Sequence, residues 1–165
     1  MDNIILIGMP GCGKSTVGVV LAKHLGFGFI DSDLLIQERE KRRLCEIIDQ
    51  EGLVRFNRIE EEVNAAIRAE HSVIATGGSV VYGPQAMEHF RQIGTVVYLK
   101  LTYEEIEERL GDLAERGVSV RPGQSLRELY GERVPLYERY AHVTVDGTGL
   151  SLREVVLKIK AACGK

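Results

Sequence analysis

Residues 4–16 read Ile-Ile-Leu-Ile-Gly-Met-Pro-Gly-Cys-Gly-Lys-Ser-Thr, and this stretch decides the fold. Its second part, Gly8 to Thr16, fits the pattern G-x-x-x-x-G-K-[ST]. The four apolar residues before it are typical of a short buried strand, and a helical pattern follows. Glycines let a tight loop turn its backbone N–H groups inward around an anion, and the helix adds the positive end of its dipole. The stretch therefore predicts a strand, a phosphate-binding loop and a helix.

This loop supplies the candidate nucleotide site. Lys14 is expected to reach the β- and γ-phosphates, and the Ser15 hydroxyl to ligate the Mg²⁺ that bridges them. The alternative is a chance glycine-rich turn between a strand and a helix. The complete match in its proper context favours the phosphate loop. We predict an ATP site formed by Gly11, Cys12, Gly13, Lys14, Ser15 and Thr16.

Length and composition are those of an ordinary soluble protein. The 165 residues suit one domain spanning 1–165, and the formal net charge of -3 gives no overall attraction to nucleic acid or anionic membranes. No apolar run approaches the roughly 18 residues of a membrane span, and no room is left for a signal peptide. Three cysteines at unrelated spacings indicate reduced thiols. We expect a cytoplasmic monomer whose partners are a nucleotide and a small-molecule substrate.

Short apolar runs alternate with helical patterns along the chain. Ser/Thr-x-x-Glu pairs beginning at Thr102, Ser125 and Ser151 predict helix capping boxes. The alternation predicts an α/β fold, a three-layer α/β/α sandwich with a five-stranded parallel sheet. Strands are expected at 4–7, 28–31, 72–76, 95–101 and 142–146, and helices at 15–25, 34–43, 51–71, 83–92, 102–110, 125–140 and from 151 onward.

Candidate acceptor residues follow the second and third strands. Asp31 and Asp33 come at the end of the second strand, where open α/β sheets place their ligands. Asp33 could hold and deprotonate an acceptor hydroxyl, while Asp31 could bind the Mg²⁺ shell through water. Either aspartate could instead simply cap the following helix. Gly77 and Gly78 follow the third strand and can offer backbone N–H groups to a ligand, or form a plain turn.

Two arginines fit the remaining needs of a phosphoryl-transfer site. Residues 111–124 contain three glycines and the pair Arg121-Pro122, which predicts a short mobile lid. Arg121 fits a charge clamp on the transferring group, although a loop arginine is often merely solvated. Arg133 could grip a carboxylate in bidentate fashion, or pair with Glu132 or Glu138.

Together these features resemble the shikimate kinases, small P-loop enzymes of the nucleoside-monophosphate-kinase fold that phosphorylate a hydroxyl of shikimate with ATP and Mg²⁺. The resemblance covers nearly the whole chain. It rests on Gly8 to Thr16, Phe29-Ile30-Asp31-Ser32-Asp33, Phe56-x-x-x-Glu60, Thr76-Gly77-Gly78, Arg121-Pro122 and Arg133-x-Pro135-Leu136-Tyr137.

The resemblance implies formation of shikimate 3-phosphate, a step of aromatic amino acid biosynthesis. It implies that Lys14 binds phosphate and Ser15 takes Mg²⁺, with Asp31 beside it. Arg121 becomes the lid arginine, so Lys14, Asp33 and Arg121 form the catalytic set. Residues 32–62 become the substrate-binding segment, and Asp146-Gly147-Thr148 falls loosely at the adenine-side loop. The substrate-binding residues are then Asp33, Asn57, Gly77, Gly78 and Arg133.

Two positions depart from the family pattern. Asn57 stands where the family usually has an arginine that contacts the shikimate carboxylate, and Ser79 stands where a third glycine is common. Loss of a charge-assisted bidentate contact typically costs about 2 to 5 kcal/mol. Two alternatives therefore stay open: a paralogue acting on another hydroxy acid or polyol, such as a gluconate-like acceptor, and a nucleotide-binding regulator without kinase turnover.

Overall fold

The computed structural model describes residues 2–110 and 118–165, and it contains a five-stranded parallel sheet with the order β2-β3-β1-β4-β5. All five expected strands are present, within about one residue of their predicted ends. Their bounds are β1 Asn3–Ile7, β2 Gly28–Asp31, β3 Ser72–Ala75, β4 Gly94–Lys100 and β5 Val143–Asp146.

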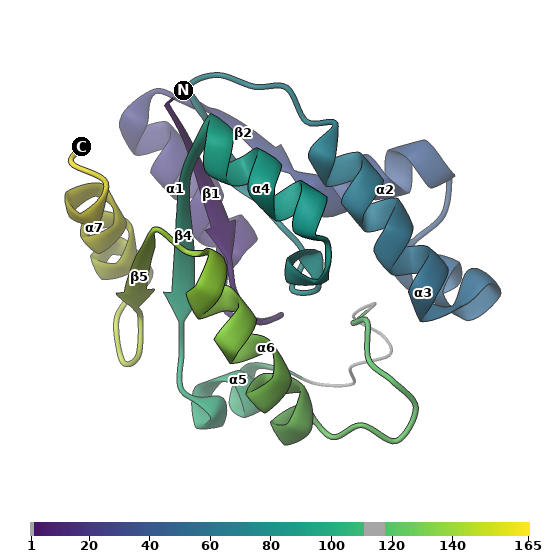
Figure 1. The fold of residues 1–165 in the computed structure, drawn as a ribbon. Helices are drawn as coiled ribbons and strands as arrows, with labels where there is room; N and C mark the ends of the chain where they lie inside the picture. The colour runs from purple at the N-terminus through teal and green to yellow at the C-terminus, as the bar shows by residue number, and fades with distance from the viewer. Residues whose placement is uncertain (1, 111–117) are drawn as a thin grey trace.

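Helices cover both faces of the sheet, as the alternation predicted (Figure 1). Helix α1 (Lys14–Leu25) contacts α7 (Leu152–Ala162) on one face. Helices α4 (Pro84–Ile93) and α6 (Leu126–Tyr140) pack against β4 on the other face. The three-layer α/β/α sandwich is therefore confirmed. The remaining elements are α2 Ser32–Glu40, α3 Leu44–Ala65, the 3-10 helix η1 Val80–Tyr82 and α5 Tyr103–Arg109.

The core forms two apolar clusters. The central strand β1 is buried throughout, because helices cover both faces of a parallel sheet, and Ile5, Leu6 and Ile7 are each 0% exposed. A second, smaller cluster joins α2 to α3. It consists of Ile36, Ile47, Phe56, Ile59 and Val63. Helices α2 and α3, which carry Asp33 and Glu60, thus have an apolar core of their own.

The prediction for the long helix was wrong at its C-terminal end and missed a helical segment that precedes it across a break. The helix expected at 51–71 begins at Leu44 and ends at Ala65, with a break at Gly52, whose φ of 82° and ψ of 169° are not helical. Ile67 is buried in the sheet core but lies beyond the helix, so its spacing from Val63 is coincidental. Likewise α2 stops at Glu40, because Lys41 adopts the left-handed conformation that ends helices.

The predicted helix caps are present, but only one is a complete capping box. Ser151 accepts from the Glu154 backbone N–H, and the Glu154 carboxylate accepts from the Ser151 N–H in return. Thr102 accepts from the Glu105 N–H, but the Glu105 carboxylate instead accepts from the Gly149 N–H at 2.8 Å. Ser125 caps α6 in the same one-sided way. The Glu105 bond ties α5 to the loop between β5 and α7.

The carboxyl ends of the parallel strands all meet at one edge of the sheet, so the loops that follow them lie together. This edge carries the phosphate loop after β1, Asp31 at the end of β2 and Gly77-Gly78 after β3. Of the predicted lid, residues 111–117 lie outside the described residues, and 118–124 contain no helix or strand. Within 2–110 and 118–165, no helix is both long and apolar enough to cross a bilayer.

Candidate active site

The phosphate loop adopts the conformation that its glycines were expected to allow. Gly13 is the N-cap of α1 with φ 96°, a left-handed conformation that favours glycine. Lys14 is 7% exposed, and its Nζ donates to the carbonyl oxygens of Gly8 at 2.8 Å and Met9 at 2.9 Å. The ammonium group therefore lies inside the loop and has hydrogen-bond partners there.

Ser15 and Asp31 lie together at the mouth of this loop. The Ser15 hydroxyl donates to Asp31 Oδ2 at 2.9 Å, while Asp31 Oδ1 accepts from the Asp33 backbone N–H at 3.0 Å. Asp31 is thus the N-cap of α2, which was the alternative interpretation of this aspartate, and it is also the partner of Ser15. A hydroxyl and a carboxylate beside a phosphate loop fit Mg²⁺, which prefers oxygen ligands and usually takes only one or two from the protein.

Asp33 is not a helix cap. Its side-chain Oδ1 is buried and has no hydrogen-bond partner among the described residues. Burial, and secondarily the charge of Asp31, raise the pKa of Asp33 to about 6, against a smaller opposing effect of Lys14. The carboxyl is therefore mostly ionised at neutral pH and ready to accept a hydrogen bond. It lines one cavity with Pro10, Gly11, Gly13, Lys14, Ser15, Thr16, Thr76, Gly77 and Gly78.

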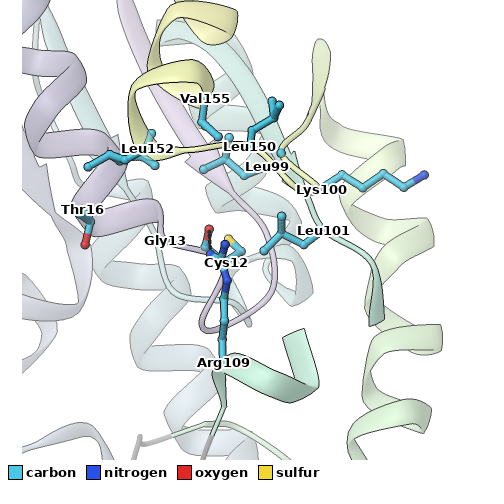
Figure 2. A pocket seen from close by; sticks show the side chains of 12 residues that line it. Cys12, Gly13, Thr16, Leu99, Lys100, Leu101, Arg109, Leu150, Leu152 and Val155 are labelled. Atoms are coloured by element: carbon cyan, nitrogen blue, oxygen red, sulfur yellow. Dashed lines mark hydrogen bonds between the residues drawn. The ribbon is translucent and has the colours of Figure 1, made fainter. Parts of the chain in front are cut away.

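A second cavity opens on the other side of the phosphate loop. Figure 2 shows Arg109 rising from α5 toward Cys12 and Gly13, with Leu101, Leu150 and Leu152 above them. The Arg109 guanidinium donates to the Cys12 carbonyl at 3.4 Å and lies 3.7 Å from a Glu105 carboxylate oxygen. The cavity thus combines an apolar wall with a guanidinium. Its lining is Cys12, Gly13, Thr16, Val17, Leu99, Lys100, Leu101, Arg109, Gly147, Leu150, Leu152 and Val155.

A third, smaller cavity of about 50 Å³ adjoins Asp33 on the side away from this wall. Its floor is Gly77, where a Cβ atom would lie 2.7 Å from Asp33 Oδ1 and 2.8 Å from Glu60 Oε2. Only a residue without a side chain lets these two oxygens approach the backbone so closely. The cavity is lined by Pro10, Asp33, Leu44, Phe56, Glu60, Gly77, Gly78, Ser79, Val118, Ser119 and Arg133.

Arg133 supplies the positive charge of this third cavity. It is 1% exposed and comes from α6. Its Nε donates to the Tyr82 hydroxyl at 3.3 Å and its Nη2 to the Ser119 carbonyl. Neither Glu132 nor Glu138 pairs with it, and no carboxylate among the described residues lies within the 4.0 Å of an ion pair. A buried guanidinium without an anionic partner is costly, so the site favours an anionic ligand.

Glu60 faces Asp33 across the same floor. It is 2% exposed, its Oε1 accepts from the Ser79 hydroxyl at 2.6 Å, and its Oε2 has no partner in the described part of the chain. Burial raises the pKa of Glu60 to about 7, although the Ser79 hydrogen bond lowers it. Two buried carboxyl oxygens without hydrogen-bond partners among the described residues, Asp33 Oδ1 and Glu60 Oε2, thus both approach Gly77 at the small cavity.

Comparison with known proteins agrees with this geometry. The sequence profile of the family described as "Shikimate kinase" matches residues 10–163. A "Shikimate kinase" of Mycobacterium avium is 40% identical over 164 residues, covering 95% of this chain and 93% of the relative. A solved structure described as "Shikimate kinase from Acinetobacter baumannii in complex with shikimate" superposes with a TM-score of 0.83 at 30% identity, covering 99% of this chain and 94% of that one. The chain belongs to the shikimate kinase family.

Membership places the chain among ATP-dependent phosphotransferases, with the nucleoside-monophosphate-kinase-like fold expected from its sequence. The structure brings most of the candidate site residues to one edge of the sheet. The cavity at the phosphate loop is lined by Gly11, Gly13, Lys14, Ser15 and Thr16 together with Asp33, Gly77 and Gly78. Cys12 instead lines the cavity that contains Arg109. Arg133 shares the smaller cavity with Asp33 and the two glycines.

Asn57 and Arg121 lie in a neighbouring cavity instead. Arg121 forms a bidentate ion pair with Glu132, with N–O distances of 3.2 and 3.1 Å, and its side chain is 64% exposed. Asn57 Oδ1 accepts from the Ser119 hydroxyl at 3.2 Å. Ser119 lines both cavities, so Asn57 adjoins, through Ser119, the cavity that contains Arg133.

Sequence reasoning missed several residues of the site. Arg109 was assigned no role. The only sequence feature that could have indicated one was its position at the end of the helix that Thr102 caps. Glu60 was named only as part of the motif Phe56-x-x-x-Glu60 and was given no role, yet it is buried with the apolar residues of α3. Its position four residues after Phe56 puts it above that apolar side chain on the helix, which could have indicated burial. Tyr82 and Ser119 contact Arg133 although they lie far from it in the sequence, and no sequence pattern indicated these contacts.

Proposed function

We propose that this chain transfers the γ-phosphoryl group of ATP to a hydroxyl of shikimate, forming shikimate 3-phosphate and ADP. One observation carries the acceptor assignment: the Arg133 cavity joins a buried guanidinium that lacks a carboxylate partner with two buried carboxyl oxygens that lack hydrogen-bond donors. A ligand that satisfies all three groups brings one carboxylate and at least two hydroxyls. Shikimate, a hydroxy acid, has this chemistry.

On the donor side, the loop at Gly11–Thr16 would hold the phosphates of ATP. Its inward N–H groups and the start of α1 favour an anion there, and Lys14 would exchange its carbonyl contacts for phosphate oxygens. Ser15 and Asp31 would hold Mg²⁺, which when bound neutralises charge on the phosphates. The apolar wall opposite Arg109 suits the flat face of adenine, with Gly147 at its edge.

In the transfer step, the acceptor oxygen forms a bond to the γ-phosphorus as the bond from that phosphorus to the ADP oxygen breaks. Asp33 would accept the hydrogen bond of the reacting hydroxyl and take its proton, because this residue lines both the cavity at the phosphate loop and the cavity with Arg133, and its Oδ1 has no hydrogen-bond partner among the described residues. Its pKa of about 6 leaves it ionised enough to do so at pH 7. Gly78 lines both cavities and would contact the acceptor.

Arg121 would clamp the transferring group, which requires it to leave Glu132. An exposed ion pair contributes at most about 1 kcal/mol, so this contact opposes such a movement only weakly. Asn57 would add a neutral polar contact beside Ser119 in place of a second arginine. We further propose that the protein works as a cytoplasmic monomer, in keeping with its three free cysteines.

The test is an assay of ADP release with ATP and Mg²⁺, run with shikimate, with gluconate and with no acceptor, and with Lys14→Ala as the blank. We expect shikimate-dependent turnover of roughly 1 to 100 per second, the usual range of kinases. ATP binding without turnover on any hydroxy acid would support a nucleotide-binding regulator instead.

The same assay on Asn57→Arg distinguishes shikimate from another hydroxy acid or polyol. If Arg133 and the two carboxyl groups suffice for shikimate, the substitution changes turnover little. A large gain from a low starting rate would instead indicate that the natural acceptor carries a neutral group at this position.

A further inference from the structure

Glu60 is held by a single side chain. Within residues 2–110 and 118–165, its carboxyl group has one hydrogen-bond partner, the Ser79 hydroxyl at 2.6 Å, and no cation lies within ion-pair distance. A carboxyl group buried this deeply usually has an arginine, a lysine or several N–H donors around it. Ser79 is therefore what fixes the orientation of the Glu60 carboxyl group.

That orientation matters because of where the other oxygen points. Glu60 Oε2 and Asp33 Oδ1 both come within 2.8 Å of the same position, the one that a Cβ atom on Gly77 would occupy. The two carboxyl groups repel each other when both are ionised, and besides burial the charge of Asp33 accordingly raises the pKa of Glu60. Without a donor on Oε1, the Glu60 carboxyl group would lower this repulsion by turning Oε2 away from Asp33.

Ser79 is suited to act through its hydroxyl alone. It is 6% exposed and lies immediately before the 3-10 helix η1, where its carbonyl accepts from the Tyr82 N–H at 3.1 Å. Its φ of -91° is one that any residue adopts, so the backbone does not require a glycine there. Compared with a glycine at this position, the serine supplies one additional group, a hydroxyl that donates to Glu60.

We propose that Ser79 is a positioning residue for the acceptor site: its hydroxyl holds Glu60 so that Oε2 stays over Gly77 beside Asp33, where the two oxygens receive two hydroxyls of the acceptor. This inference rests on the proposed function, because it takes a polyhydroxy acid as the ligand. It gives the serine that departs from the family pattern a role in substrate affinity. Ser79 acts on the substrate through Glu60.

The test is a double-mutant cycle with Ser79→Ala, Glu60→Leu and the combined variant, each measured for the KM of shikimate, the KM of ATP and kcat. Leucine at position 60 has no oxygen that could accept from the Ser79 hydroxyl, whereas glutamine would keep one. Loss of a hydrogen bond to a charged group should raise the KM of shikimate about 10-fold in Ser79→Ala. The KM of ATP should not change. Because Ser79 acts through Glu60, the combined variant should have the same KM for shikimate as Glu60→Leu alone. Effects that multiply, or an unchanged KM in Ser79→Ala, would overturn the proposal.

A matched control separates positioning from packing. Ser72→Ala also removes a buried serine hydroxyl, but one that donates to the Glu70 carbonyl at the opposite end of the sheet. It should leave the KM of shikimate unchanged. An equal rise of KM in Ser72→Ala would mean that loss of a buried hydroxyl, and not loss of the Glu60 contact, causes the effect.

A second measurement does not depend on turnover. The carboxyl ¹³C resonance of Glu60, assigned by its absence in Glu60→Gln, reports its pKa in the free protein. The groups that face Glu60 are Asp33 from α2, Arg133 from α6 and Lys14 from α1, and all three remain in Ser79→Ala. Loss of the hydrogen bond should raise the pKa of Glu60 by about one unit. An unchanged pKa refutes the contact, whereas absence of shikimate turnover in the unmodified protein refutes the proposed function.

Discussion

The donor half and the acceptor half of the site satisfy their polar groups in opposite ways. In the donor half, Lys14 donates to two backbone carbonyls and Ser15 donates to Asp31, so each group has a partner without any ligand. In the acceptor half, Asp33 and Glu60 each keep one buried oxygen without a donor, and Arg133 has no carboxylate partner. The donor half is complete by itself, whereas the acceptor half gains its missing partners from the substrate.

The two halves also differ in how the chain builds them. The phosphate loop and the start of α1 are one continuous stretch, while the acceptor groups come from α2, α3, the segment after β3 and α6. Unpartnered buried groups cost stability. We therefore expect substitutions in the donor half to lower the affinity for ATP and the turnover. Substitutions in the acceptor half should lower activity while leaving the free energy of unfolding unchanged or raising it.

Lys14→Ala should have the largest effect. It removes the one side-chain cation of the phosphate loop, and loss of such electrostatic stabilisation lowers kcat by about 10³-fold or more. ADP release in the presence of shikimate measures it. The control is Lys23→Ala, an exposed lysine on the same helix, which should change nothing. Retention of a tenth of the activity in Lys14→Ala would contradict this role.

Asp33→Asn should come next and should separate the halves most clearly. The amide cannot take the proton of the acceptor hydroxyl, so kcat should fall by about 10² to 10³-fold. The Kd of ATP, measured by calorimetry, should not change. Asp49→Asn, at an exposed position of α3, is the control. A weaker ATP affinity in Asp33→Asn would show that this aspartate belongs to the donor half as well.

Arg133→Lys should raise the KM of shikimate by about 30-fold, because an ammonium group cannot form the bidentate contact of a guanidinium with a carboxylate. The KM of ATP should stay within about twofold of its value in the unmodified protein, because Arg133 hydrogen-bonds to Tyr82 and Ser119 and not, within the described residues, to the phosphate loop. The matched variant is Arg139→Lys, an exposed arginine on the same helix. An unchanged KM for shikimate would mean that the acceptor carboxylate binds elsewhere.

Glu60→Gln tests how much the buried carboxyl group of the acceptor half lowers the free energy of unfolding. Burial raises the pKa of Glu60 from 4.5 to about 7, so the folded state holds this proton more tightly than the unfolded state. The resulting stabilisation is fully present below pH 4.5 and is lost as the pH rises through about 7. At pH 8 the glutamine variant should be more stable than the unmodified protein by up to about 3 kcal/mol, and at pH 4.5 by almost nothing.

Urea unfolding at the two pH values measures this difference. Glu88→Gln, at an exposed position of α4, should show no pH-dependent gain. A Glu60→Gln variant that is less stable at pH 8 would mean that the ionised carboxyl group is stabilised by its surroundings.

The same contrast explains how much of the molecule could be predicted from its sequence. The phosphate loop was predicted residue by residue, because its chemistry depends on backbone conformation and neighbouring side chains. The sheet followed from the alternation of short apolar runs with helical patterns, and five strands were placed correctly. Local information was sufficient for both.

The acceptor half could be predicted only in part. Asp33 and Gly78 were predicted to lie at this edge because strand ends mark ligand sites, and Arg133 was predicted to bind a carboxylate from its guanidinium chemistry and then from the family resemblance. The pairing of Ser79 with Glu60 joins residues 19 positions apart on different elements, and no periodicity reveals it. The bounds of α3 failed for a different reason: Gly52 is exposed and adopts a φ of 82°, a local conformation that favours glycine, and the chain leaves the helix after Ala65.

The most direct measurement of the central claim is ³¹P NMR of a reaction containing the protein, shikimate, Mg²⁺ and a limiting amount of ATP. If the two halves act together as proposed, a phosphate monoester signal should appear in a one-to-one ratio with ADP, and no inorganic phosphate should form. Inorganic phosphate in place of the monoester would contradict the account, because it would show that the donor half works and that the acceptor half does not receive shikimate.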